Sequence, residues 1–160
     1  MFETIYFNEL FYNPAYILKK ELLNIPLFGT YLKKLGMIAI DRAQGIQSLR
    51  HVNQQTAEYL DHRPVIIFPE GTRSQDGKPK KFHKKGLMTL IENMPNAVIL
   101  PISINNSWRI AQYNYFPIPI GIKITFTSHN PIILGDISIE KALSQVEKVI
   151  RGGINFKSPM

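Results

Sequence analysis

The feature that most constrains the fold of this sequence is an apolar, mostly β-branched run, Pro64-Val65-Ile66-Ile67-Phe68. No polar residue alternates with the apolar ones. Such a run is typical of a strand buried on both faces of a parallel sheet, and residues 97–100 have the same character. We therefore predict an α/β fold with a mainly parallel central sheet flanked by helices.

Helical patterns alternate with the strand patterns. Three helices are predicted from the spacing of their apolar residues, and they cover residues 26–35, 46–60 and 139–150. Ser138 is the expected N-cap of the third helix, and Gly152-Gly153 is its terminator. Two further strands are predicted at residues 37–40 and 122–127, the second with one wetter face. Because there is no repeat, low-complexity tract or linker, we predict one continuous domain over residues 1–160.

Composition narrows the function classes. The chain has no cysteine, which excludes disulfides, thiolate nucleophiles and sulfur-ligated zinc. Its formal net charge of +7 favours anionic partners, which include nucleic acid, anionic lipid headgroups and phosphorylated substrates. No stretch approaches the roughly 18–20 apolar residues of a membrane-spanning helix, so any membrane contact of this chain is predicted to be peripheral.

A polar turn, Glu70-Gly71-Thr72-Arg73, follows the first apolar run directly after Pro69. Ligands of open α/β sheets bind beyond the carboxyl ends of the strands. There, a glycine lets the backbone approach a ligand, a threonine offers a hydroxyl, and the planar guanidinium suits phosphate. The glutamate would orient that guanidinium or a substrate hydroxyl. The alternative is a solvated turn with a surface ion pair, and the residues alone leave both readings open.

The complete motif, Phe-Pro-Glu-Gly-Thr-Arg-Ser at residues 68–74, resembles the phosphate-binding signature of the glycerol-phosphate and lysophosphatidate acyltransferase family. Other blocks resemble that family in the same order along the chain. They are residues 20–29 with Ile40-Asp41-Arg42, then Lys84-Lys85-Gly86, and then residues 98–102. The resemblance implies a glycerol-phosphate acyltransferase-like α/β domain over residues 1–160, incomplete at its N-terminus.

The resemblance also implies a reaction. A histidine acts as general base on the free hydroxyl of 1-acylglycerol 3-phosphate, which attacks the thioester of acyl-CoA or acyl-carrier protein. The residues it assigns to the substrate phosphate and glycerol are Glu70, Gly71, Thr72, Arg73, Arg42 and Lys84. It implies no metal and no cofactor besides the acyl donor as co-substrate. The implied partners are the lysophospholipid, the acyl donor and an anionic membrane surface on the cytoplasmic side, with no nucleic acid.

The family's first block, a histidine followed after four residues by an acid, is absent from the printed sequence. None of the four histidines has Asp or Glu five positions later. Met1-Phe2-Glu3-Thr4 resembles the end of a His-Gln-Ser-x-x-Glu-Thr variant of the block. In that register Glu3 is the catalytic acid partner, and the histidine would stand three residues before Met1. We therefore expect a start assigned too late or a truncated gene; the alternative is that Glu3 is a solvated residue near a free terminus.

The remaining histidines and aromatic residues receive structural interpretations. His51 and His62 are predicted on a helix surface or end, His129 in a loop, and His83 in a basic loop near phosphate or simply in solvent. An aromatic segment within residues 105–121 would rest at a membrane interface or pack under its own loop. We favour packing for this segment.

Three functions therefore remain open. The first is an acyltransferase longer than the printed chain and attached to the membrane. The second is a non-catalytic remnant that binds phosphate or lipid. The third is a small basic nucleic-acid-binding protein, which we disfavour because no recognition motif accompanies the charge.

Overall fold

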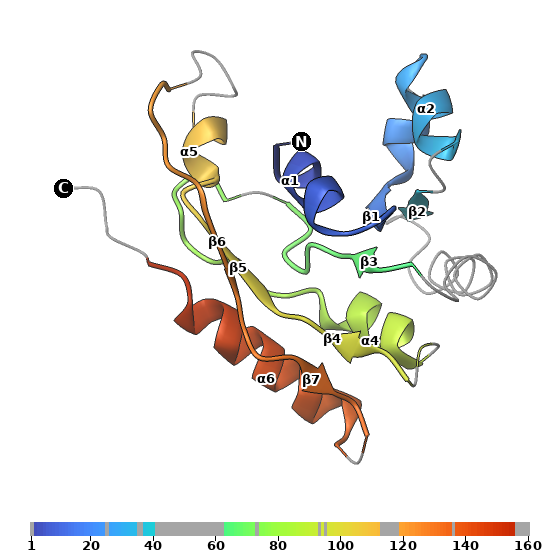
Figure 1. The fold of residues 1–160 in the computed structure, drawn as a ribbon, viewed down its shortest axis with the longest axis vertical. Helices are drawn as coiled ribbons and strands as arrows, with labels where there is room; N and C mark the ends of the chain where they lie inside the picture. Colours follow the sequence, from blue (N-terminus) through green and yellow to red (C-terminus); the bar gives the residue numbers. More distant parts are fainter. Residues whose placement is uncertain are drawn as a thin grey trace. The chain divides into compact units, whose positions relative to one another are not determined.

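The structure, a computed structural model, describes residues 2–24, 26–34, 37–40, 63–72, 74–92, 94, 96–112, 119–135 and 137–155. The chain divides into two compact units, Met1–Phe68 and Pro69–Met160. Figure 1 shows the elements of each unit, coloured from blue at the N-terminus to red at the C-terminus.

The first unit contains a parallel three-stranded sheet. Its elements in chain order are α1 (Phe2–Leu10), β1 (Ala15–Lys19), η1 (Lys20–Asn24), α2 (Phe28–Lys34), β2 (Ile38–Ile40) and β3 (Val65–Ile66). β1 is central, pairing Ile17 with Ile38 of β2 and Ala15 with Val65 of β3. The predicted parallel sheet is confirmed in this unit.

Aromatic side chains form much of the core of the first unit. Phe7 of α1 is buried, and its ring lies 6.3 Å from that of Phe68. Tyr16 of β1 is also buried, and its hydroxyl donates a 3.0 Å hydrogen bond to Asn8 Oδ1. This burial raises the pKa of Tyr16 to about 12. α1 is thereby fixed against the strands of its own unit.

Gly29 shows why one resembling block carries a glycine. It is a buried residue of α2, and a Cβ built on it would collide with the backbone oxygen of Leu23. Because only glycine fits, α2 can pack directly on η1, and the two elements are in contact. The helix predicted after Pro26 is confirmed, and it ends at the expected lysines.

The described residues of the second unit form three helices and two antiparallel strand pairs. Its elements are α4 (Lys84–Glu92), β4 (Val98–Ile99), β5 (Ile102–Asn105), α5 (Trp108–Ala111), β6 (Thr125–Ser128), β7 (Ile132–Ile133) and α6 (Ile139–Gly152). β4 pairs with β7, and β5 pairs with β6. The sequence predicted strands at β4 and β6 but not this antiparallel pairing.

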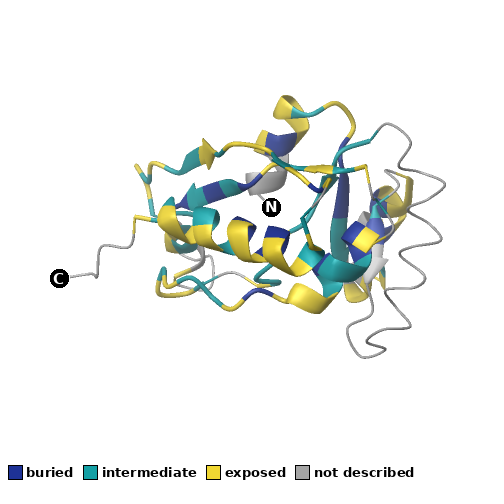
Figure 2. Ribbon diagram, turned by 90° about the horizontal axis from the view of Figure 1, so that it is seen from below, coloured by how far each residue is buried: buried dark blue, intermediate teal, exposed yellow. Residues whose placement is uncertain are grey.

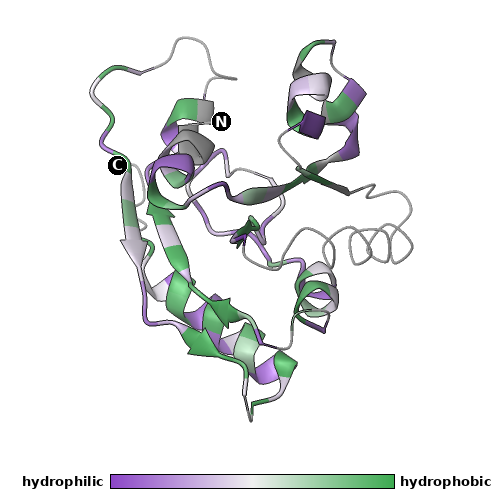
Figure 3. Cartoon of the chain, turned by 45° about the vertical axis from the view of Figure 1, so that its right-hand side comes forward, coloured by the Kyte–Doolittle hydropathy of each residue, from purple (hydrophilic) through white to green (hydrophobic). Residues whose placement is uncertain are grey.

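The long helix α6 organises the second unit. Its apolar side chains Ala142, Leu143 and Val146 are buried, and it packs against α4 and β5. Buried and exposed positions alternate along its ribbon (Figure 2), as do hydrophobic and hydrophilic ones (Figure 3). That alternation is the 3.6-residue periodicity that predicted the helix from the sequence.

Two strands are shorter and more exposed than predicted. The run at residues 64–68 forms only β3, Val65–Ile66, and both residues are half-buried. β3 is hydrogen-bonded to β1 alone among the described strands. In β4, Val98 is exposed and Ile99 is half-buried, so the prediction of burial on both faces was wrong for these residues. The predicted helix at residues 46–60 lies outside the described residues.

The N-cap of α6 provides a stability test. Ser138 has extended backbone angles, and its hydroxyl accepts a 3.3 Å hydrogen bond from the backbone N–H of Lys141. Ser138→Ala should lower the unfolding free energy by about 1 kcal/mol, or about 2–4 °C in Tm by calorimetry. Ser144→Ala, at an exposed interior position of the same helix, should be neutral or slightly stabilising. Equal losses in both variants would contradict the assigned cap.

Candidate functional site

The motif residues open a long loop of the second unit, which we call the motif loop (residues 69–83). The backbone N–H of His83 donates a 2.8 Å hydrogen bond to the carbonyl oxygen of Pro69, closing the base of the loop. α4 begins immediately afterwards at Lys84. The described residues of the motif loop form no helix or strand, which is uncommon for a segment of this length inside a compact domain, and such loops are usually functional.

Glu70 is tied to the far side of the loop. Burial raises the pKa of its carboxyl above the ordinary value. A hydrogen bond from the backbone N–H of Lys80 and the positive charges of Arg151 and Lys80 oppose that rise. The carboxylate is thus half-buried but surrounded by groups that favour its ionised form.

The backbone of the loop is shaped by two glycines in the left-handed region. Gly71 has φ +66° and Gly77 has φ +83°, conformations that other residues adopt only with strain. At Gly77 a side chain is also excluded by space, since a Cβ would lie 2.7 Å from Cε2 and Nε1 of Trp108. The indole therefore packs on the motif loop, whereas the sequence-based expectation for the aromatic segment of residues 105–121 was packing under its own loop.

A carboxylate orders the turn between these points. Asp76 Oδ1 accepts hydrogen bonds from the backbone N–H of Lys78 at 3.0 Å and from the Ser74 hydroxyl at 2.9 Å. These bonds hold the pKa of Asp76 below its usual range. Thr72, which precedes this turn, is exposed, as a residue that meets a ligand from solvent would be.

Apart from Lys84, the predicted site residues fall into three groups. Glu70, Gly71 and Thr72 lie together in the motif loop. Glu3 lies in the first turn of α1, in the other unit. Arg42 and Arg73 lie outside the described residues, so their assignment stays a prediction.

Lys84 has a partner that the sequence did not reveal. Its Nζ lies 2.9 Å from Oε2 of Glu147 on α6. The first turn of α4 holds no acid of its own, although the positive end of a helix dipole favours one. Glu147 supplies that negative charge from a neighbouring helix.

A serine–histidine pair outside the motif loop has a structural role. Ser103 is fully buried on β5, with Oγ 2.7 Å from Nε2 of His129. The serine hydroxyl already donates its proton to the carbonyl oxygen of Ile150 at 2.8 Å, so the Nε2 nitrogen must donate to Oγ. A base that activates a serine has to accept that proton instead. The pair therefore ties the C-terminal end of α6 to the strands.

Asn105, two positions along β5, continues this attachment. Its Nδ2 donates to the carbonyl oxygen of Gly153 at 2.9 Å, and its Oδ1 accepts from the backbone N–H of Asn155 at 2.8 Å. Carbonyl groups at a helix C-terminus lack intrahelical partners. Ser103 and Asn105, on one strand, each donate a hydrogen bond to a carbonyl oxygen at the C-terminal end of α6. The sequence did not single out either residue, because their partners lie far along the chain.

Comparison with known proteins identifies the family. The protein-family model named Acyltransferase matches residues 2–105. A 1-acyl-sn-glycerol-3-phosphate acyltransferase of Pseudomonas aeruginosa is 35% identical over 130 residues, covering 79% of this chain and 50% of that protein. The enzyme of that name from Helicobacter pylori is 39% identical over 109 residues, 63% of this chain and 45% of the relative.

A solved structure gives the same result for the fold. The crystal structure of the 1-acyl-sn-glycerophosphate (LPA) acyltransferase PlsC from Thermotoga maritima aligns with a TM-score of 0.63 and 29% identity, over 88% of this chain and 55% of that one. The chain belongs to the Acyltransferase family, which confirms the resemblance and the α/β fold class. It spans about half the length of the curated relatives it matches.

Two kinds of feature are absent from the described residues. No helix there is both long and apolar enough to cross a membrane. No group of three or more His, Cys, Asp or Glu side chains in those ranges is arranged to hold a metal ion.

The raised pKa of Glu70 leads to a stability prediction. A carboxyl whose folded pKa exceeds its unfolded pKa favours folding at low pH, and that contribution is lost as pH rises through the folded pKa. Glu70→Gln should therefore raise Tm slightly at pH 7, on the order of 1 °C because solvent screens the site, and should give no gain at pH 4. Scanning calorimetry at both pH values, with Glu92→Gln at an exposed position as control, measures this. A loss of stability at pH 7 alone would contradict it.

Proposed function

We propose that this chain forms the substrate-binding part of an enzyme that transfers a fatty acyl group to 1-acylglycerol 3-phosphate in phospholipid synthesis. The donor is acyl-CoA or acyl-carrier protein, and the motif loop binds the phosphate and glycerol of the acceptor. The observation that carries the proposal is the motif loop itself: it combines a half-buried Glu70 with a left-handed Gly71, within a chain of the Acyltransferase family.

The chemistry assigns a task to each group. The free hydroxyl of the acceptor attacks the thioester carbonyl, so that a new C–O bond forms and the C–S bond breaks. A histidine removes the hydroxyl proton and returns it to the departing thiolate. We place this histidine three residues before Met1, with Glu3 stabilising the imidazolium as its acid partner. Arg73 and Arg42 balance the charge of the phosphate.

A non-catalytic phosphate or lipid binder is the alternative. It is motivated by the printed sequence, in which no histidine stands five residues before an acid. The two functions differ once the in-frame upstream residues are restored. An enzyme then transfers acyl groups, whereas a binder still does not. Loss of a general base typically slows a reaction about a hundred- to ten-thousandfold, so the two outcomes are well separated.

Ligand binding by the 160-residue chain tests the motif loop directly. Arg73→Ala should weaken glycerol 3-phosphate binding about ten- to a hundredfold, because a charge-assisted hydrogen-bond partner is removed. Isothermal titration calorimetry measures the Kd. Arg109→Ala is the matched control, since Arg109 is an exposed arginine of α5 outside the motif loop.

Two results would overturn the proposal. One is wild-type chain that does not bind glycerol 3-phosphate at millimolar concentration, and the other is Arg73→Ala binding as tightly as Arg109→Ala. The acyl-transfer step is measured separately, with labelled acyl-CoA and lysophosphatidate, on the chain extended upstream to the proposed histidine. The printed chain should show no turnover, and the extended chain should be active.

We further propose that the chain works against the anionic cytoplasmic surface of a membrane. Lys81 and Lys85 are exposed at the end of the motif loop and the start of α4. Each lysine near such a surface contributes about 1 kcal/mol, so Lys81→Gln with Lys85→Gln should weaken vesicle binding about tenfold or more. Co-sedimentation with phosphatidylglycerol-containing vesicles measures this, with Lys141→Gln plus Lys148→Gln on α6 as the charge-matched control. Equal losses in both pairs would indicate only a net-charge effect.

A further inference from the structure

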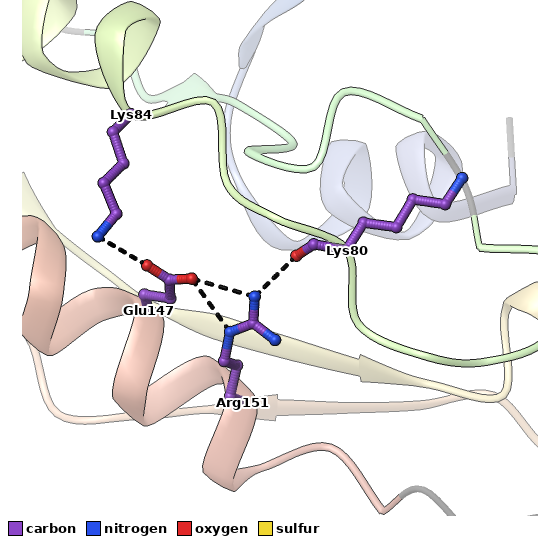
Figure 4. A network of polar contacts seen from close by, with 4 residues as sticks. All are labelled: Lys80, Lys84, Glu147 and Arg151. Atoms are coloured by element: carbon purple, nitrogen blue, oxygen red, sulfur yellow. Dashed lines mark hydrogen bonds and ion pairs between the residues drawn. The ribbon is translucent and has the colours of Figure 1, made fainter.

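Glu147 of α6 lies between two cations. Its Oε2 is 2.9 Å from Nζ of Lys84, and its Oε1 is 3.0 Å from Nη2 and 3.1 Å from Nε of Arg151. Figure 4 shows the carboxylate bridging the two side chains. One carboxylate therefore forms ion pairs with both cations.

Arg151 carries the connection into the motif loop. Its Nη2 donates a 3.0 Å hydrogen bond to the carbonyl oxygen of Lys80, and its guanidinium lies 5.9 Å from the ring centroid of buried Phe82. The side chain of Lys80 extends away from Arg151, so it is the backbone that is bound (Figure 4). The same residue offers its N–H to Glu70. A continuous chain of polar contacts thus runs from Glu147 to the motif glutamate.

We propose that Glu147 is a positioning residue that holds the motif loop through Arg151. Glu147, Arg151 and Lys84 form an ion-pair cluster that we call the brace. Lys84 belongs to this brace and does not bind the substrate phosphate. The consequence for ligand binding rests on the function proposed above. Among the described residues, the polar contacts of Glu147 are with Lys84 and Arg151, so it acts by fixing Arg151, which fixes the Lys80 backbone and with it the carboxylate of Glu70.

The geometry distinguishes this brace from an ordinary surface ion pair. The side chain of Glu147 is only 19% exposed and serves two cations at once. An exposed pair that breaks leaves its partners to water, and its loss is often unmeasurable. Here the loss of one carboxylate leaves Lys84 and Arg151 close together beside the positive end of the α4 dipole. Arg151 is then repelled from the position in which it binds the loop.

The brace includes a tertiary contact between residues that lie far apart in the sequence. Arg151 and Glu147 form an i,i+4 pair on α6, but the bond to Lys80 spans 71 residues. A fixed position of Lys80 matters because the Glu70 carboxylate accepts from its backbone N–H. Small displacements of such supporting groups are sufficient to weaken a site that depends on geometry.

The experiment compares Glu147→Gln with Glu140→Gln, an exposed glutamate of the same helix outside the brace. Amide hydrogen exchange by NMR reports on the N–H groups of Lys80 and His83, and titration calorimetry gives the Kd for glycerol 3-phosphate. We expect Glu147→Gln to speed exchange of these amides and to weaken binding, each about two- to fivefold. Glu140→Gln should change neither quantity, and Glu147→Asp should restore part of both.

Lys84→Met separates the two roles open to that lysine. If Lys84 is a member of the brace, Lys84→Met should weaken glycerol 3-phosphate binding no more than Glu147→Gln does. Introducing Glu147→Gln into the Lys84→Met variant should then raise the Kd by a smaller factor than Glu147→Gln does in the wild-type chain. Non-additivity of this kind identifies residues that act through one contact. A far larger loss for Lys84→Met than for Glu147→Gln would assign the lysine to the phosphate and overturn that part of the proposal.

The remaining outcomes are also decisive. Unchanged exchange in Glu147→Gln would overturn the brace. Faster exchange with an unchanged Kd would leave the brace in place but overturn the positioning of the ligand site. If the wild-type chain does not bind glycerol 3-phosphate, the proposed function fails, while the exchange rates still decide whether Glu147 holds the loop.

Discussion

The backbone of Lys80 is the point on which the geometry of the candidate site depends. Its N–H donates a hydrogen bond to the Glu70 carboxylate, and its carbonyl oxygen accepts one from Arg151. Near the same residue, the base of the motif loop is closed by the bond from His83 to Pro69. A loop without regular structure would otherwise sample many conformations, and the entropy of ordering it would oppose ligand binding. Three backbone bonds from different directions reduce that cost before a ligand arrives.

Sequence patterns correctly predicted the helices whose start signals, end signals and apolar periodicity lie within or next to the helix itself. α6 was expected from its apolar periodicity, with its start at Ser138 and its end near Gly152, and it is found there. The helix after Pro26 was predicted because its signals also lie within a few residues. The composition of the motif was equally informative: Gly71 occupies the left-handed conformation for which a glycine is the ordinary choice. In these cases propensity and tertiary structure agree.

Features that depend on distant partners could not be predicted in this way. β5 was not predicted, and its antiparallel pairing with β6 joins residues as far apart in the chain as Ile102 and Ser128. No sequence signal singled out Ser103, although it is fully buried and binds both His129 and the end of α6. The predicted burial of β3 on both faces was wrong, because a run of apolar residues indicates a strand but not how fully its faces are covered. No local signal identified Glu147 as the ion-pair partner of Lys84.

The region that matches the family does not contain all the residues that hold the motif loop in place. The matched family region ends at residue 105, whereas the side chains that hold the motif loop are at 147 and 151. The end of α6 that carries Arg151 is in turn held by Ser103 and Asn105, which lie within that region. Side chains of β5 therefore hold the C-terminal end of α6, and Arg151 of α6 in turn holds the motif loop. A motif of seven residues can specify which groups meet a phosphate, but their positions are set by contacts that the motif does not contain.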